Sequence, residues 1–168
     1  MPPENRSGED VAAASGDVQA LIELLFFAYR DFTSDPDDLL KKDGFGRAHH
    51  RVVHFVDRNP GMRVADLLDI LRITKQSLGR VLRQLVDRGY IEQREGPNDR
   101  RERRLYVTEQ GARLAETLAR PQRQRIAQAL SALPEGGDAI ARAFLLELVN
   151  PSERDKVEAI VTDEKTAP

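Results

Sequence analysis

Residues 73–111 read ITKQSLGRVLRQLVDRGYIEQREGPNDRRERRLYVTEQG, and this stretch decides the fold. Its first part, residues 74–88, repeats apolar side chains at helical spacing, with Thr74 suited to cap the helix and Gly89 to end it. Another helix with the same spacing, residues 64–71, stops only two or three residues earlier. Two helices joined by so short a turn are typical of a helix-turn-helix.

The helix over residues 74–88 would bury one side and present polar side chains on the other. Glutamine can pair bidentately with adenine, arginine can pair bidentately with guanine, and both can reach phosphates. The inward side carries Leu78, Val81, Leu82, Leu85 and Val86. The opposite side carries Gln76, Arg80, Arg83 and Asp87, with Lys75 and Ser77 exposed in the first turn. This pattern favours a recognition helix in the major groove, and an ordinary solvated helix face is the alternative.

A strand-like alternation follows in YIEQRE, residues 90–95, and in RRLYVT, residues 103–108, so a two-stranded hairpin is expected. Its tip lies in residues 96–104, where four of the five positions from 100 to 104 are arginine. A hairpin directly after a recognition helix can serve as a wing, and the narrow, negative minor groove of A·T tracts favours an inserted arginine. We expect Asp99 to orient an arginine as its charge partner. A solvated surface turn is the alternative.

Charge is distributed unevenly along the 168 residues, whose formal net charge is −2. From residue 46 to 110 there are fourteen Lys and Arg but nine Asp and Glu, a net charge of +5, whereas the remainder carries −7. A basic middle within an acidic frame indicates a polyanionic partner. The absence of cysteine excludes disulfides, thiolate zinc sites and thiol nucleophiles. The N-terminus lacks a signal-peptide core and LIELLFFAY, residues 21–29, is too short to span a bilayer, so we expect a soluble cytoplasmic protein without a membrane partner.

Flanking helices complete a mainly α fold with a small β-hairpin wing. Residues 1–15 and 151–168 are expected to be flexible tails. A helix from Asp17 to Phe32 should end in the segment containing Pro36, and it is apolar around its girth, as in a core or a subunit interface. The remaining expected elements are a helix over 47–59, a helix from Glu109 with a kink or break at Pro121, and a last helix capped by Asp138. We assign 16–34 and 109–150 to dimerisation helices and 46–110 to the winged helix-turn-helix.

The stretch 73–111 resembles the winged helix of the multiple-antibiotic-resistance regulator (MarR) family. The shared pattern consists of Thr74, Ser77, Arg80 and Leu85, then Tyr90-Ile91-Glu92-Gln93-Arg94, then Asp99-Arg100-Arg101, and finally Thr108-Glu109-Gln110-Gly111. The resemblance implies an obligate homodimer that reads a palindromic operator, with Arg101 in the minor groove and Asp99 bracing the wing. The DNA-binding residues expected on this basis are Thr74, Lys75, Gln76, Ser77, Arg80, Arg83, Arg100, Arg101 and Arg103.

Two residues depart from that pattern or weaken a helix. Arg72 stands in the turn where the family usually has glycine, so a strained backbone or a modified turn is expected. Gly79 lies inside the recognition helix and costs about 1 kcal/mol relative to alanine. Its missing side chain suits either a close DNA backbone or a close neighbouring helix, and the sequence does not favour one of these.

The sequence also offers a possible ligand crevice and a possible metal site, and two functions other than DNA binding. The resemblance implies a small-molecule effector in a crevice between the dimer helices and the winged lobe, which would be lined by Phe26, Phe27, Tyr29, His50 and His54. His50 and His54 could instead share a metal, with Asp57 or Asp43, although core or interface histidines are the simpler expectation. No cofactor, metal or enzymatic activity is expected. The alternatives are a winged-helix protein–protein module, and a metal- or ligand-responsive sensor using His50 and His54.

Overall fold

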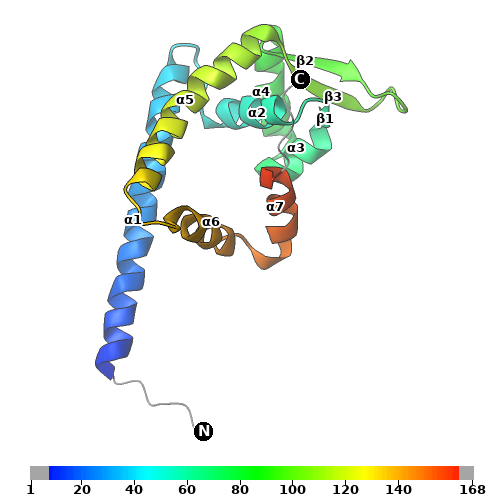
Figure 1. Cartoon of the computed structure of the whole chain (residues 1–168). Helices are drawn as coiled ribbons and strands as arrows, with labels where there is room; N and C mark the ends of the chain where they lie inside the picture. Colours follow the sequence, from blue (N-terminus) through cyan, green and yellow to red (C-terminus); the bar gives the residue numbers. More distant parts are fainter. Residues whose placement is uncertain (1–7, 163–168) are drawn as a thin grey trace.

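The computed structural model describes residues 8–162 and confirms a mainly α fold with a small sheet (Figure 1). The predicted tail residues 1–7 and 163–168 lie outside the described residues. The elements, in chain order, are α1 Gly8–Lys41, α2 Arg47–Arg58, β1 Met62–Arg63, α3 Val64–Leu71, α4 Lys75–Asp87, β2 Ile91–Glu95, β3 Arg103–Val107, α5 Glu109–Ser131, α6 Gly137–Glu147, the 3-10 turn η1 Pro151–Glu153, and α7 Arg154–Thr162.

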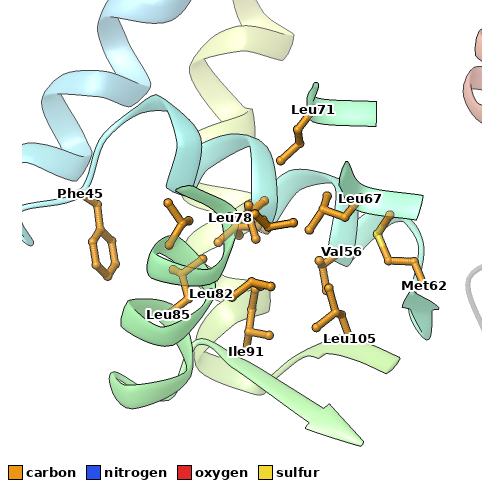
Figure 2. Packing of buried hydrophobic residues seen from close by; sticks show 14 of the residues in the cluster. Phe45, Val56, Met62, Leu67, Leu71, Leu78, Leu82, Leu85, Ile91 and Leu105 are labelled. Carbon is orange, nitrogen blue, oxygen red and sulfur yellow. The ribbon is translucent and has the colours of Figure 1, made fainter. Parts of the chain in front are cut away.

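A single apolar cluster holds the winged lobe together. Figure 2 shows Leu78, Leu82 and Leu85 of α4 pointing into the space between α2, α3 and the sheet. The predicted inward side of α4 is confirmed, because Val81 is also buried and Val86 packs against the cluster from its edge. The same core contains Val52, Val53 and Val56 of α2, Leu67 and Leu71 of α3, Ile91, Leu105 and Met62 of the sheet, Ala115 and Leu118 of α5, and Leu40 and Phe45 from the end of α1 and the loop after it. Burial of each such side chain stabilises the fold by about 1.5–3 kcal/mol.

The sheet has three antiparallel strands in the order β1-β3-β2, one more than the sequence predicted. The hairpin pairs Ile91 with Val107 and Glu95 with Arg103, so its base and its tip are both in register. The added strand β1 is only two residues long, and it pairs Met62 with Leu105. This short strand carries no periodic signal of its own and exists because β3 supplies its hydrogen-bonding partner.

A corner built around Thr108 and Gly111 joins α4, the hairpin and α5. Gly89 ends α4 with φ +76°, and Tyr90 N–H donates to the Leu85 carbonyl at 2.9 Å, as in a Schellman motif. Thr108 Oγ1 donates to the Gly89 carbonyl at 2.6 Å and accepts from Gly111 N–H at 3.0 Å, so one hydroxyl caps α5 and fastens it to the end of α4. The predicted Gly89 stop is therefore confirmed.

The expected end of the first helix near Pro36 is wrong, because α1 continues without interruption to Lys41. Proline lacks an N–H and therefore leaves the Phe32 carbonyl, four residues earlier, without its helical donor. The Gln122 amide of α5 donates to that carbonyl at 3.2 Å, and the Pro36 side chain is buried. Further along the same contact, Arg125 pairs with Asp35 at 3.1 Å. A partner from a distant segment thus supplies what the proline removes.

The expected flexible ends also differ from the structure. Residues 8–15 belong to α1, and residues 151–162 form η1 and α7, so helix replaces the predicted tail in both segments. Helix α5 continues through Pro121 without a break. Asp138 lies in the first turn of α6, where Gly136 takes the N-cap position that we had assigned to Asp138. No helix within residues 8–162 combines the length and the apolar character needed to cross a bilayer.

We predict that Gly111→Ala destabilises the protein by at least about 3 kcal/mol, because a β-carbon there would lie 1.9 Å from the Tyr90 carbonyl oxygen. Chemical unfolding followed by circular dichroism measures this change. The matched control is Gly16→Ala in α1, where an added β-carbon meets nothing within 4 Å. This control should be neutral or stabilising by up to about 1 kcal/mol. Equal stability of the two variants would contradict the close approach of α5 to Tyr90.

Candidate nucleic-acid interface

The exposed side of α4 is fixed by its cap and by its buried side. Thr74 Oγ1 accepts from Ser77 N–H at 3.1 Å, as predicted for an N-cap, and also donates to Ser77 Oγ at 2.9 Å. Both hydroxyls, which we had counted among the DNA-binding groups, are thus engaged in the cap. Because the leucine side of α4 is buried in the core, the opposite side must face solvent.

That solvent side forms a shallow polar hollow. Its lining residues are Gln76, Ser77, Gly79, Arg80 and Arg83. Within the described part of the chain, the guanidinium groups of Arg80 and Arg83 make neither a hydrogen bond nor an ion pair. A β-carbon added at Gly79 would meet nothing within 4 Å, so a close neighbouring helix in the same chain does not explain this glycine. The hollow therefore offers two free cations beside a bare stretch of helix backbone.

The wing keeps its shape through backbone contacts at its tip. Gly96 N–H donates to the Glu102 carbonyl at 2.9 Å, which closes the loop. Asp99 Oδ1 accepts from the backbone N–H of Arg101 at 2.8 Å. Among the described residues Asp99 makes no ion pair, so the expectation that it orients an arginine through charge is wrong. Asp99 instead holds the backbone of the residue that the resemblance assigns to the minor groove.

The four clustered arginines are not equivalent. Arg104 points back into the lobe, where its guanidinium contacts Glu102 at 2.5 Å and the Gly61 carbonyl at 3.0 Å. Arg100 and Arg103 both approach Glu95, at 4.0 and 3.6 Å. The Arg101 guanidinium has no hydrogen bond or ion pair with the side chains that the structure describes, residues 16–162, or with the backbone of the lobe. Arg101 is thus the cation of the tip that is left free for an external anion.

His49 anchors α4 to the start of α2, a role that the sequence did not reveal. Its Nδ1 accepts from Gly46 N–H at 3.1 Å, which places the ring proton on Nε2, and Nε2 donates to Gln84 Oε1 at 2.7 Å. The ring also stacks on Phe45, with centroids 4.4 Å apart. Burial lowers the pKa of His49 because the charged ring would lose hydration, and the nearby Arg80 and Arg88 act in the same direction.

The other two histidines do not form the sites considered from the sequence. The rings of His50 and His54 lie edge to face with centroids 6.5 Å apart. Among the side chains that the structure describes, residues 16–162, no three His, Asp or Glu are grouped so that they could hold a metal ion. His54 lines a hollow between α2, α5 and α7, and Phe32 of α1 lines it as well.

The ligand crevice predicted from five residues does not come together within the described chain. Of that set, only His54 lines the hollow beside α5. Helix α1 turns Phe26, Phe27 and Tyr29 outward, and Phe26 leaves 70% of its surface exposed. The Tyr29 ring lies against the Arg47 guanidinium, with 5.6 Å between the guanidinium carbon and the ring centroid. These aromatic residues therefore belong to an exposed apolar face and not to a cavity wall.

Comparison with known proteins gives consistent matches. The model of the MarR family matches residues 43–102. The HTH-type transcriptional regulator PetP of Rhodobacter capsulatus is 47% identical over 133 residues, which are 79% of this chain and 80% of PetP. Streptococcus pneumoniae FabT in complex with DNA has a TM-score of 0.69 at 18% identity, covering 78% of this chain and 94% of FabT. A MarR family regulator from Listeria monocytogenes complexed with a 26mer DNA has a TM-score of 0.66 at 20% identity, covering 88% and 97% of the two chains.

We predict that the pKa of the His49 ring lies below 6.5, the ordinary value for histidine, because the ring is partly buried and its charged form loses hydration there. The unfolded chain then binds a proton at a pH where the folded chain does not, so stability falls as the pH drops below about 6.5. Imidazole NMR signals report the pKa directly. In chemical unfolding at pH 7 and pH 5.5, His49→Gln should lose less stability on acidification than the wild type. Parallel losses in the two proteins would contradict this role of His49.

Proposed function

Because this chain belongs to the MarR family of transcriptional regulators, we propose that it binds duplex DNA as a homodimer and regulates transcription from a palindromic operator. The observation that carries the proposal is the coincidence of free cations on two adjoining elements. Arg80 and Arg83 on α4 and Arg101 on the wing lack protein partners among the described residues, although most other arginines of this lobe have one. Function by binding, rather than by catalysis, agrees with the family.

In the proposed complex α4 lies in the major groove. Gln76, Arg80 and Arg83 project from the same exposed side, and their side chains suit adenine, guanine or phosphate contacts. Lys75 at the first turn suits a phosphate, because the N-terminus of a helix also attracts anions. The open space above Gly79 would allow the DNA backbone to approach the helix closely.

The wing would lie along the neighbouring minor groove. Arg101 is the residue we propose to enter it, with its backbone held by Asp99. Arg100 and Arg103 share one carboxylate, Glu95, at 4.0 and 3.6 Å, and both guanidinium groups remain accessible to solvent, so they suit phosphate contacts beside the groove. Arg104 is excluded from this set because its guanidinium is engaged within the lobe.

Exposed apolar surface supports the homodimer. One chain leaves many large apolar side chains in solvent along α1, α5 and α6, and so much exposed apolar surface in a protein of this size indicates an interface. These side chains are Val18, Leu21, Ile22, Leu24, Leu25, Phe26 and Phe27 of α1, Ile126 and Leu130 of α5, Ile140, Phe144 and Leu145 of α6, and Leu148 at the C-cap of α6. Pairing two copies about a twofold axis would cover this surface and present two recognition helices to a palindrome.

A small-molecule effector is part of the proposal. The hollow beside His54 is lined by Phe32, Ile126 and Leu130, and its charged residues are two arginines and two carboxylates, namely Arg58, Arg123, Asp57 and Glu116. A mainly apolar molecule suits this lining. The hollow lies between the helices that we assign to the dimer and the winged lobe, so its occupant would influence how the two are arranged.

A protein–protein module remains the competing function of a winged helix. Such a module needs neither free arginines on the recognition side nor an unpaired arginine at the wing tip, so the distribution of charge favours DNA. Binding to DNA through phosphates releases counterions and therefore weakens steeply as salt increases. A salt series on the same complex distinguishes the two functions.

We predict that Arg101→Ala lowers the affinity for operator DNA by about tenfold or more, which corresponds to about 1.4 kcal/mol. The circular dichroism and unfolding midpoint of this variant should match the wild type, because the Arg101 guanidinium makes no hydrogen bond or ion pair within the described chain. Arg120→Ala on α5 is the control, since it removes the same charge away from the wing. Fluorescence anisotropy with labelled duplexes gives both affinities. An equal loss in the two variants would mean that Arg101 acts through overall charge alone.

We predict that the wild-type protein, incubated with random duplexes at two salt concentrations, enriches a palindrome with half-sites about one helical turn apart. Arg80→Ala should relax the preference at one position of each half-site and cost about 1–3 kcal/mol on the preferred sequence. A uniform loss on all sequences would instead identify Arg80 as a phosphate contact. If no sequence is enriched and binding is weak, the proposed function itself is wrong.

A further inference from the structure

The C-terminal segment 151–162, here called the strap, returns from the end of α6 to the helix-turn-helix (Figure 1). Two ion pairs connect it to α3 and to the turn that follows α3. Arg72 Nη2 lies 2.9 Å from Glu153 Oε1, and Lys156 Nζ lies 3.4 Å from Asp69 Oδ2. The sequence predicted a flexible tail here, so neither contact was expected.

Arg72 adopts a backbone conformation that side chains rarely tolerate. Its φ is +50°, in the left-handed region, and its N–H donates to the Leu68 carbonyl at 2.9 Å at the end of α3. This confirms the strained turn expected from the sequence. Glycine adopts such a conformation without steric cost, whereas arginine does not. A strained arginine is therefore best explained by what its side chain does, and its guanidinium contacts Glu153.

The position of this contact links it to DNA reading. Arg72 is separated from Thr74, the N-cap of α4, by a single residue, so displacement of Arg72 moves the first turn of the recognition helix. At the other end, Arg154 fastens the strap to α6. Its guanidinium donates to the Val149 carbonyl at 3.1 Å and to the Glu147 carbonyl at 2.7 Å, and it pairs with the Glu147 carboxylate at 2.7 Å.

We propose that the strap couples α6 to the helix-turn-helix through Arg72 and Glu153, and that these two residues are positioning residues which fix the spacing of the two recognition helices. The proposal rests on the proposed function, because it requires a dimer that reads two half-sites. Helix α6 belongs to the proposed dimer interface. The strap connects it to the turn before α4 through two contacts, Arg154 with Glu147 at α6 and Glu153 with Arg72 at the turn. The strap would therefore control the selectivity of the dimer for the spacing between half-sites.

The packing indicates that the strap affects orientation more than stability. The side chain of Arg72 is 66% exposed and that of Glu153 is 29% exposed, so solvent screens their attraction. A hollow lined by Phe55, Ile70, Val157 and others separates the strap from α2 and α3. With little apolar burial beneath it, loss of the ion pair should change where the strap sits without unfolding the lobe.

Arg72→Gly removes the ion pair and at the same time relieves the left-handed turn, so loss of the pair is not masked by added strain. Its unfolding midpoint should equal or exceed that of the wild type. Glu153→Gln breaks the pair from the other side, and the double variant Arg72→Glu with Glu153→Arg reverses it. Arg113→Gln is the matched control, since Arg113 pairs with Glu109 within α5 and connects no separate elements.

Two measurements test the proposal. Hydrogen exchange of the protein without DNA follows the amides of residues 68–77 and 151–162, which should exchange faster in Arg72→Gly and Glu153→Gln. The second measurement is the affinity for palindromes whose half-sites are moved apart or together by one base pair, which reports the selectivity for spacing. In both variants the affinity ratio between the best and the shifted spacing should fall at least threefold. The reversed pair should restore that ratio, and the Arg113→Gln control should keep it.

The outcomes separate this inference from the function on which it rests. Unchanged exchange in both single variants would overturn the strap contact. Faster exchange with an unchanged spacing ratio, or no restoration by the reversed pair, would overturn the positioning role while operator binding stands. A wild-type protein that binds no duplex selectively would refute the proposed function and, with it, the role of the strap in reading DNA.

Discussion

The packing of α5 against the Tyr90 carbonyl is the constraint on which the rest of the winged lobe depends. Because Gly111 has no side chain, the first turn of α5 reaches the point where α4 ends and β2 begins. Thr108 connects three segments. Its hydroxyl caps α5 and donates to the Gly89 carbonyl, and its backbone N–H donates to the Tyr90 carbonyl at 3.0 Å. The recognition helix, the hairpin and the long helix α5 therefore share one rigid corner, and the direction of any one of them sets the direction of the other two.

Charge alone would have assigned the wing incorrectly. Residues 100–104 contain four arginines, but Arg104 stabilises the junction with Gly61 and two others share Glu95. A paired guanidinium must first give up its partner before it binds a phosphate, whereas a free one does not. The same reasoning separates Arg80 and Arg83 of α4 from Arg88, whose guanidinium donates to the Asp43 carbonyl and lies against the Phe45 ring. Availability of the cation, rather than the number of cations, identifies the surface that suits DNA.

The sequence predicted those parts of the structure that local patterns determine. The two faces of α4, its Thr74 cap, the Gly89 stop and the hairpin follow from spacing within a few residues, and the structure confirms each of them. The errors occur where distant segments supply the missing interaction. Gln122 satisfies the carbonyl that Pro36 leaves free, β3 provides the only strand partner that β1 has in the described chain, and the ion pairs of the strap hold a segment that looked too polar to fold. The sequence prediction left Arg104 out of the DNA-binding set, but it could not give the physical reason, because that reason is a hydrogen bond to a carbonyl more than forty residues away in the sequence.

The apolar surface of α1 and α6 and the ionic contact at Arg72 differ in how easily each can be separated once it has formed. The apolar side chains of α1 and α6 would be buried once and kept buried, since separating them again would expose them to water. The ion pair between the strap and Arg72 is partly exposed to solvent, so it orients the strap but adds little to the free energy of folding. It can also break without exposing apolar surface. A rigid corner around Gly111 and a weakly held turn at Arg72 lie at opposite ends of the recognition helix. The first therefore fixes α4 within its lobe, and the second is where, in the proposed dimer, a change in the helices of the interface would alter the proposed angle between α4 and DNA.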